Sequence, residues 1–505
     1  MDKVIVFIPA NLSIPTWQRD VVEVLKRYYL VDYCSVERDK SESKLRSFLK
    51  LKDKIPRIFY AIQLLTESKL FRINFGEVKL ENSKVLKCYP KGTRYVDIVE
   101  VSDCQFAASD YVFGLNFGFR IVRGGILGMF KGGLLGFHHG DPDNYRGSAP
   151  GFFEIHNGEP FVGLIIQRLS EELDGGEVLA KSFVPCHYSL GLTQNWLFEK
   201  SSVLMTEFLS GATYKEQSPM TQSFHRVYKF PKFVFILIYI LKFWIRLIKS
   251  FFKRKMEKYV PGRDWSIGYL TGGRLRTVLM SNRDYYYADP FSLPDGSLVC
   301  ERFNRKLNVG EIIRVNNGKI IELLTDKDCH KSYPYYIKYK GFNYIIPETG
   351  VSKEIFLLKE IDGNYILIDS LETPQEIFDF SVFSDAEDYY GFYTVGNRGA
   401  DSLYSVKIES IDPLKIDFSD STLITTDERF TRCGGRVWVE EESVYRIIQQ
   451  QRFGNYGESI GIAVHDRYDL RSFDYVPLLN INQNFGLLNL HTLDVFTGLI
   501  DYKKK

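Results

Sequence analysis

The stretch that decides the fold of the N-terminal part is GGLLGFHHGDPDNYRGSAPGF (residues 132–152), followed by GEPFVGLIIQRLSEELDGGEVL (residues 158–179). An apolar run leads into His138, and Asp174 follows 36 positions later beside two glycines. A histidine and a carboxylate that converge on one pocket can polarise a carbonyl group and transfer a proton. Glycines such as Gly140 let the backbone approach a ligand closely. The pattern therefore predicts a site suited to acyl transfer to an amine.

This block resembles the catalytic segment of the folate-dependent formyltransferases, the family of methionyl-tRNA, glycinamide ribonucleotide and nucleotide-sugar N-formyltransferases. The matching residues are Leu134-Leu135, His138, Pro142, Tyr145-Arg146-Gly147, Gly163 and Leu173-Asp174-Gly175-Gly176. The resemblance covers roughly the first 190 residues. It implies a Rossmann-like domain with His138 and Asp174 as the catalytic pair and 10-formyltetrahydrofolate as the co-substrate.

One position departs from the family pattern. The family places an asparagine two residues before the histidine, and this chain has Gly136 there. In the family, that asparagine and the histidine bind the oxygen of the developing tetrahedral intermediate, and loss of one such donor typically costs about 100- to 1000-fold in rate. The sequence leaves open whether His139, Asn144 or Asn116 substitutes, or whether the domain keeps the fold without the chemistry.

The resemblance also implies the remaining site residues. The folate would be held largely by backbone of the loop that contains Gly114, Asn116 and Gly118, and by the loop that ends at Asp174. The predicted substrate-binding residues for the acceptor are His139, Asp141, Asn144 and Arg146. Arg146 could instead brace its own loop.

Alternation of strands and helices extends over the N-terminal third. We predict strands at residues 4–8, 30–36 and 84–88 and a helix at residues 17–29. This order predicts a Rossmann-like α/β sheet within a domain of residues 1–200, with ligands at the carboxyl ends of its strands. No GxGxxG motif follows the first strand, so a nicotinamide cofactor is not indicated.

The composition is that of a soluble globular protein. The 505 residues are 45% hydrophobic and 25% charged, which predicts two or three domains with substantial cores. The net charge of +2 gives no field that would attract nucleic acid. The seven cysteines are scattered without a CxxC spacing, so we expect reduced thiols, a cytoplasmic protein and no metal site. The start MDKVIVFIPA lacks the basic region of a signal peptide. Oligomeric state is not predicted.

A basic amphipathic helix is predicted at residues 233–254, within a connecting region of residues 201–262. Nine apolar residues begin it, and Lys242, Arg246, Lys249 and Lys253 recur on one helical face. A membrane span needs about 20 apolar residues, so we do not expect this helix to cross a bilayer. We expect it to lie peripherally on an anionic membrane surface. The alternative is a helix buried between domains.

Residues 263–505 change to strands and turns. Turn-to-strand passages begin at residues 295, 340, 388, 442 and 492, which are 45, 48, 54 and 50 residues apart. A period near 50 with several strands per repeat is typical of propeller blades, so we predict an all-β five-bladed propeller. A two-sheet sandwich is the alternative.

Further motifs add a second resemblance. YYADPF (residues 286–291), HKSYP (330–334), IPETG (346–350) and RCGGR (432–436) resemble the five-bladed propeller domain of plant glucosamine inositolphosphorylceramide transferases and the propellers of family 43 glycoside hydrolases. The predicted propeller pocket consists of Asp289, His330, Glu348, Arg436 and His491. These residues could bind a sugar, pin the edges of blades, or hydrolyse a glycosidic bond with Asp289 as the base and Glu348 as the second carboxylate.

Together these features lead to one main hypothesis and two alternatives. The main hypothesis is transfer of a formyl group from a formyl-folate to the amine of a nucleotide- or lipid-linked amino sugar, in surface polysaccharide biosynthesis. The first alternative is a membrane-associated glycan-binding scaffold with an inactive formyltransferase fold. The second is a propeller glycoside hydrolase or transferase that uses Asp289 and Glu348.

Overall fold

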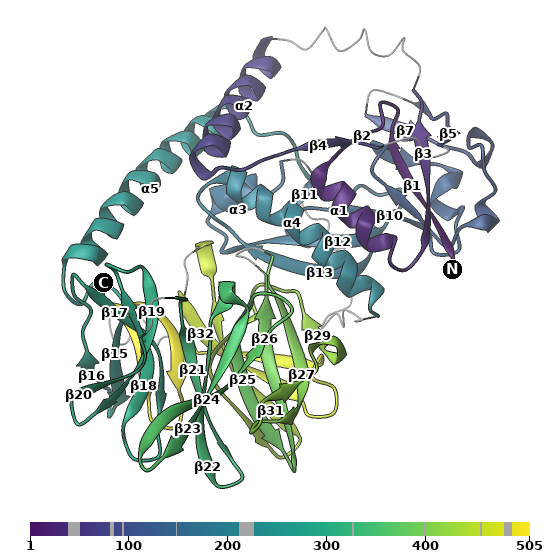
Figure 1. Ribbon diagram of the computed structural model, residues 1–505. Coiled ribbons are helices and arrows are strands. Elements are labelled where there is room, and N and C mark those ends of the chain that lie inside the picture. The colour runs from purple at the N-terminus through teal and green to yellow at the C-terminus, as the bar shows by residue number, and fades with distance from the viewer. Residues whose placement is uncertain are drawn as a thin grey trace. The chain divides into compact units, whose positions relative to one another are not determined.

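The computed structural model describes residues 1–38, 51–80, 85–92, 95–147, 149–211, 227–325, 328–396, 400–454, 457–478 and 487–504. The chain divides into two compact units, Met1–Ile245 and Arg246–Lys505 (Figure 1). The first unit mixes helices with strands, and the second is built almost wholly of strands. The predicted order of an α/β part followed by a strand-rich part is therefore confirmed.

A seven-stranded sheet lies at the centre of the first unit, in the order β13-β12-β10-β8-β1-β3-β5. Its five parallel strands are β1 (Lys3–Pro9), β3 (Leu30–Val36), β5 (Leu86–Cys88), β8 (Gly114–Asn116) and β10 (Leu134–His138). The antiparallel strands β12 (Phe161–Arg168) and β13 (Glu177–Pro185) extend it beyond β10. Val4–Ile8 of β1 is a continuous buried apolar run, as expected of a strand covered on both faces.

The helices of this unit are α1 (Thr16–Leu25), α2 (Leu51–Phe71), α3 (Phe152–Asn157) and α4 (Leu190–Leu209). α1 ends four residues before the predicted boundary at Tyr29, because residues 26–29 turn directly into β3. The short strands are β2 (Ser13–Pro15), β4 (Glu77–Lys79), β6 (Lys91–Gly92), β7 (Val96–Ile98), β9 (Ile121–Arg123), β11 (Arg146–Gly147) and β14 (Val227–Tyr228).

α5 (Phe233–Tyr259) runs from the first unit into the second and covers the range of the predicted helix. Its buried residues Ile236, Tyr239 and Phe243 recur every three to four positions, so one side of the helix packs on protein. Among the described residues, no helix has both the length and the apolar composition that a bilayer span requires.

In the part of the second unit that the structure describes, the strands form five antiparallel sheets, and a single parallel bridge between Gly435 and Leu493 joins the fourth and the fifth into one eight-stranded sheet. The first is β17 (Tyr285–Ser292), β18 (Leu298–Asn304), β19 (Val309–Asn316) and β20 (Lys319–Leu324), and the second is β21 (Ser332–Tyr339), β22 (Phe342–Glu348), β23 (Glu354–Ile361) and β24 (Asn364–Glu372). The third is β25 (Ile377–Asp385), β26 (Asp388–Val395), β27 (Ser402–Ser410), β28 (Lys415–Ile416) and β29 (Thr422–Thr425), and the fourth is β30 (Arg432–Glu440), β31 (Ser443–Gln450), β32 (Ser459–Asp466) and β33 (Phe473–Pro477). The fifth joins β34 (Leu487–Asp494) and β35 (Leu499–Lys504) to β15 (Ser266–Thr271) and β16 (Arg274–Leu279).

The five sheets repeat one local irregularity. The register shifts near the middle of β17, β21, β25, β30 and β34, between the pairs Ala288/Phe291, Ser332/Tyr335, Phe378/Ser381, Cys433/Val437 and Leu490/Leu493. These five strands contact one another in chain order, and β34 also contacts β17. The five sheets thus share a bulge in the corresponding strand, and each of these bulges bends its strand locally.

Candidate functional site

The pair at the centre of the predicted site is formed. His138 ends β10 and is buried, and its Nδ1 lies 3.4 Å from Asp174 Oδ1. Its Nε2 lies 3.0 Å from the carbonyl oxygen of Tyr145. Both ring nitrogens therefore face oxygen acceptors, and both can donate at once only when the imidazole is protonated.

Backbone geometry holds this arrangement in place. Asp174 has a φ of +50°, a left-handed conformation that costs a non-glycine residue about 1 kcal/mol or more. Its Oδ2 accepts a hydrogen bond from the backbone N–H of Gly147 at 2.9 Å. A Cβ at Gly140 would lie 2.8 Å from His138 Nε2 and from the Tyr145 carbonyl oxygen. The glycine is thus required for the histidine to reach that carbonyl.

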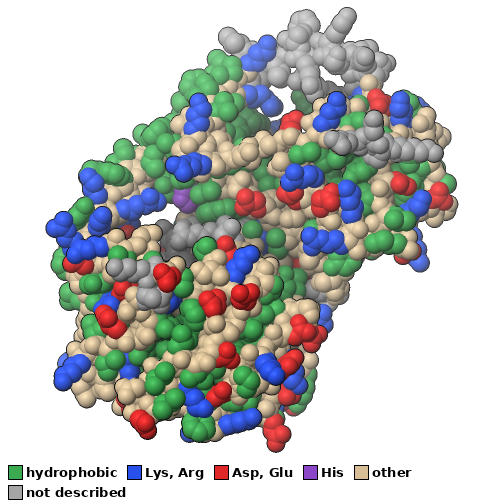
Figure 2. All heavy atoms as spheres, in the orientation of Figure 1, with side chains coloured by type: hydrophobic (Ala, Val, Ile, Leu, Met, Phe, Trp, Pro, Cys, Tyr) green, Lys and Arg blue, Asp and Glu red, His purple; other side chains and the backbone are tan. Residues whose placement is uncertain are grey.

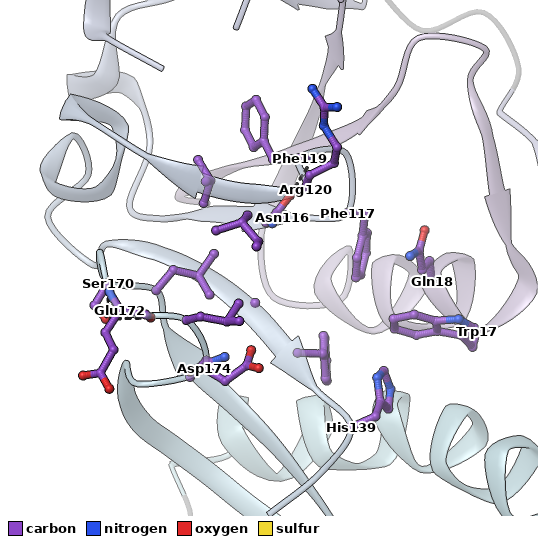
Figure 3. A pocket seen from close by; sticks show the side chains of 17 residues that line it. Trp17, Gln18, Asn116, Phe117, Phe119, Arg120, His139, Ser170, Glu172 and Asp174 are labelled. Carbon is purple, nitrogen blue, oxygen red and sulfur yellow. Dashed lines mark hydrogen bonds between the residues drawn. The ribbon is translucent and has the colours of Figure 1, made fainter. Parts of the chain in front are cut away.

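A cavity of about 330 Å³ lies beside Asp174 (Figure 3). The loop from Asn116 to Val122 lines one side, and Ser170, Glu172 and Asp174 line another. The two segments predicted to hold folate therefore meet at one cavity. Asn116 Oδ1 accepts a hydrogen bond from Phe119 N at 2.8 Å, which leaves the amide NH2 group available to a ligand.

Gly114 and Gly118 lie beneath the cavity wall and do not line it. A Cβ at Gly114 would lie 2.7 Å from Phe130, and one at Gly118 would lie 2.7 Å from Val36 and 2.8 Å from the Ile8 backbone. Both glycines therefore allow the loop to pack tightly on the core. A folate in this cavity would contact the backbone of neighbouring residues such as Phe117, and not these two glycines themselves.

His138 and Asp174 face different spaces. Among the described residues, Asp174 lines the large cavity, whereas His138 lines a small hollow of about 10 Å³ with Tyr145 and Glu154. Glu154 belongs to α3 and is 3% exposed, and burial raises its pKa to about 7. Asp174 thus connects the large cavity to the buried histidine.

His139 is held by aromatic rings. Its ring makes edge contacts with Trp17 and Phe198, each at a centroid distance of 5.1 Å, and its Nε2 lies 3.1 Å from Ser201 Oγ. Burial, with a contribution from His138, lowers the pKa of His139 to about 3. His139 therefore lines the cavity as a neutral side chain.

The other predicted substrate-binding side chains bind within the protein. Asp141 pairs with Lys181 at 2.7 Å and accepts a hydrogen bond from Asn144 Nδ2 at 2.9 Å. Burial acts to raise the pKa of Asp141, but Lys181 and Asn144 hold it below its usual range. Arg146 pairs with Glu172 at 2.6 Å and donates to the Pro142 carbonyl, so it braces its loop.

In the second unit, Asp289 and His491 are in contact. Asp289 Oδ1 lies 3.0 Å from His491 Nε2 and accepts a hydrogen bond from Thr492 Oγ1 at 3.1 Å. On its other side, His491 Nδ1 lies 2.8 Å from Asp501 Oδ2, so three potential metal-binding side chains cluster within 4.8 Å. His491 bridges the two carboxylates directly. This bridge accounts for the cluster without an ion and favours a structural role for Asp289.

The other residues predicted for the propeller pocket also have protein partners. Glu348 is buried and accepts a hydrogen bond from Phe380 N at 3.0 Å; burial, with the nearby Asp379 carboxylate, raises its pKa to about 8. His330 accepts a hydrogen bond from Gly310 N at 2.8 Å. Arg436 donates to the Ser292 carbonyl at 2.6 Å, which ties the fourth sheet to the first. The contacts of Arg436 therefore support a structural role, in which it joins two sheets.

Comparison with known proteins bears on the first unit. No family model matches the chain. A curated relative, the methionyl-tRNA formyltransferase of Agathobacter rectalis, is 34% identical over 76 residues, or 15% of this chain. The chain spans about a quarter (24%) of the length of that relative. The N-terminal region is formyltransferase-like.

Several solved structures are also similar to parts of the chain. Phosphoribosylglycinamide formyltransferase from Streptococcus pneumoniae is 14% identical, with 42% of this chain and 98% of that chain covered at a TM-score of 0.25. The sugar 3N-formyl transferase WlaRD, in the presence of dTDP and 5-N-formyl-THF, is 15% identical. The match covers 45% of this chain and 70% of that chain at a TM-score of 0.24. The α-L-arabinofuranosidase PaAbf62A from Podospora anserina, in complex with cellotriose, is 10% identical. The match covers 40% of this chain and 74% of that chain at a TM-score of 0.31.

The formyltransferase-like region differs from the family pattern at Gly136, which lines the cavity. A Cβ at this position would lie 3.0 Å from Cδ2 of Leu169 and 3.3 Å from its Cδ1 and Cγ. Leu169 thus occupies the space that a side chain at position 136 would need. Of the three proposed substitutes for the missing asparagine, Asn116 keeps a donor group at the cavity, while Asn144 donates to Asp141.

Sequence reasoning missed several residues of the formyltransferase-like region. Lys181 lies at a partly buried position of β13, and Glu154 is a single carboxyl in a short helix. Trp17 is the first residue of the predicted helix, and it also lines the cavity. None of these residues stands in a motif, so only the fold could place Lys181 beside Asp141, Glu154 beside His138 and Trp17 beside His139.

Proposed function

We propose that the first unit transfers a formyl group from a formyl-folate donor to the amine of an amino sugar. The observation that carries the proposal is the contact of His138 Nδ1 with Asp174 Oδ1 beside a cavity lined by the Asn116 loop. A histidine held by a carboxylate is suited to accept the proton that an attacking amine releases. The likeness of this region to a formyltransferase supports the same chemistry.

The cavity suits the donor in size and lining. Its volume of about 330 Å³ is in the range of small-molecule sites, roughly 300–1,000 Å³. Phe119, Val122 and Leu173 provide apolar walls for a flat ring system, and the Asn116 amide provides a polar contact. When bound, a formyl-folate supplies an activated one-carbon acyl group.

The roles of the catalytic pair follow from their contacts. The neutral amine attacks the formyl carbon, a new C–N bond forms, and the bond from that carbon to the donor nitrogen breaks. Asp174 orients His138 and balances the charge of its imidazolium. For His138 to take the proton from the amine and return it to the leaving nitrogen, its Nε2 must first leave the Tyr145 carbonyl oxygen, which lies 3.0 Å away. No side chain extends from position 136 to share the developing oxygen charge, so we expect a slow enzyme.

We propose further that the five sheets of the second unit close into a five-bladed propeller that binds a glycan. Two observations support closure. β34, near the end of the unit, contacts β17 of the first sheet, and the fifth sheet combines strands from both ends of the unit. Register shifts also recur in the corresponding strands β17, β21, β25, β30 and β34, as expected of repeated blades.

Calorimetry tests the donor site first. A formyltetrahydrofolate analogue that cannot transfer its formyl group should bind the intact protein saturably, and Asp174→Ala should weaken that binding. Nucleotide-linked amino sugars then serve as acceptors, with the matching hydroxyl sugars as controls that lack the amine. Absence of binding at millimolar analogue would overturn the folate assignment. Donor binding without product from any amino sugar would overturn the acceptor assignment.

A further inference from the structure

α2 and the first half of α5 pack side by side within the first unit. Tyr239 OH donates to Glu67 Oε1 at 2.6 Å, and the rings of Phe59 and Phe233 lie 5.1 Å apart. A second ring pair, Phe71 with Phe243, lies 6.4 Å apart at the other end of the same seam. These contacts join the two helices into one element.

The sides of the two helices that point away from the seam are apolar and exposed. Leu65 of α2 and Leu241 of α5 are each 63% exposed. We call the exposed apolar residues that lie opposite the seam on α2 and on the first half of α5 the two-helix face; its members are Ile58, Ile62 and Leu65 of α2 and Val234, Leu237, Ile238, Leu241, Trp244 and Ile245 of α5. Within each helix they recur at intervals of three or four residues, so they share one side. Soluble monomers rarely leave a large group of exposed apolar side chains without a partner.

Cations accompany this face, and exposed acids do not. Lys54, Arg57 and Lys69 are exposed on α2, and Lys242 is exposed on α5. Glu67, the acid on the described side chains of α2, is buried in the seam. Among the described side chains of the two helices, none of the exposed charges is negative. Figure 2 shows green hydrophobic and blue basic side chains together along these helices.

We propose that the two-helix face docks on a lipid bilayer rich in anionic headgroups. Its apolar side chains would enter the boundary between headgroups and acyl chains, and the cations would meet lipid phosphates. Trp244 is of the residue type that prefers this boundary. A continuous anionic surface complements a face that has several exposed cations and no exposed acid. The sequence predicted membrane contact for residues 233–254 only, and the structure adds α2 to that surface. Membrane docking by this face does not depend on formyl transfer.

Vesicle co-sedimentation of the full chain tests the proposal. The protein should sediment with phosphatidylcholine vesicles that contain phosphatidylglycerol and remain in solution with phosphatidylcholine alone. Ile62→Asp with Leu65→Asp, which changes α2 only, should lower the partition coefficient at least tenfold, as should Leu241→Asp. Ile320→Asp is the matched control, since Ile320 is an exposed isoleucine on β20. It should bind like the unchanged protein.

Two further measurements test the same contact with lipid. Trp244 fluorescence should shift to shorter wavelength with anionic vesicles, and the shift should be lost in Trp244→Phe. Raising the salt concentration should weaken binding, because the attraction is screened. Equal binding by the α2 variant would remove α2 from the surface. Failure to bind either vesicle, together with concentration-dependent self-association that Leu65→Asp abolishes, would instead assign the face to a second copy and overturn the proposal.

Discussion

Asp174 holds His138 with one carboxylate oxygen and the backbone of Gly147 with the other, at 3.4 Å and 2.9 Å. Asp174→Asn keeps the shape and loses the charge that balances an imidazolium. We expect kcat/KM for formyl transfer to fall about 1000-fold or more, with the fold retained. Glu177→Gln, which removes an exposed charge at the start of β13, should have no effect. A loss below tenfold in Asp174→Asn would show that the pair is not catalytic.

Leu169 fills the space beside Gly136, so an asparagine restored there needs room. We expect Gly136→Asn combined with Leu169→Ala to raise the rate of formyl transfer about tenfold or more, because one oxyanion donor is worth about 100- to 1000-fold. Leu169→Ala alone serves as the reference. If the double variant is no faster than that reference, another group already stabilises the oxygen.

Glu154 should make stability depend on pH. Burial raises its pKa to about 7 from 4.5, so the folded protein keeps a proton that the unfolded chain loses. Its contribution is complete below about pH 4.5 and is lost as the pH rises through about 7, which amounts to about 3 kcal/mol. The melting temperature of Glu154→Gln should therefore fall less than that of the unchanged protein between pH 5 and 8. Parallel curves would contradict the assignment.

Asp501 should stabilise the second unit strongly. Its side chain is fully buried and accepts hydrogen bonds from the backbone of Asp289 at 2.9 Å and of Thr492 at 2.8 Å. Asp501→Ala leaves both donors and His491 without this partner, and we expect a loss of about 3–5 kcal/mol. Asp388→Ala, which breaks an exposed pair with Lys407, should cost at most about 1 kcal/mol. Urea unfolding of both variants, followed by tyrosine and tryptophan fluorescence, makes the comparison.

Cys88 and Cys104 should form a disulfide under oxidation. Their sulfur atoms lie 2.9 Å apart, and all seven cysteines are free in the structure. Oxidised glutathione should remove one hydrogen from each thiol and take up both electrons, so intact-mass spectrometry should show a loss of two hydrogens. Cys104→Ser should abolish that loss. Continued alkylation of both thiols after oxidation would contradict the prediction.

Much of the first unit was predictable because its signals are local. The apolar run of residues 4–8 required a strand buried on both faces, and the structure has β1 there. The spacing of cations after Phe233 predicted a helix, which α5 provides. His138 and Asp174 stand in recognisable patterns, so their roles could be proposed from residue types alone. The end of α1 was wrong by four residues, because apolar spacing continues into the turn before β3.

The sequence by itself determined that an α/β part precedes a strand-rich part, and it singled out His138 and Asp174 by their local pattern. Only the tertiary structure decided which atoms meet. It placed Leu169 against Gly136, Lys181 against Asp141, and Asp501 against the backbone of Asp289, 212 residues away. The physical reason is that periodicity reports burial and local conformation, whereas a contact between distant segments depends on sheet register, bulges and side-chain packing in three dimensions.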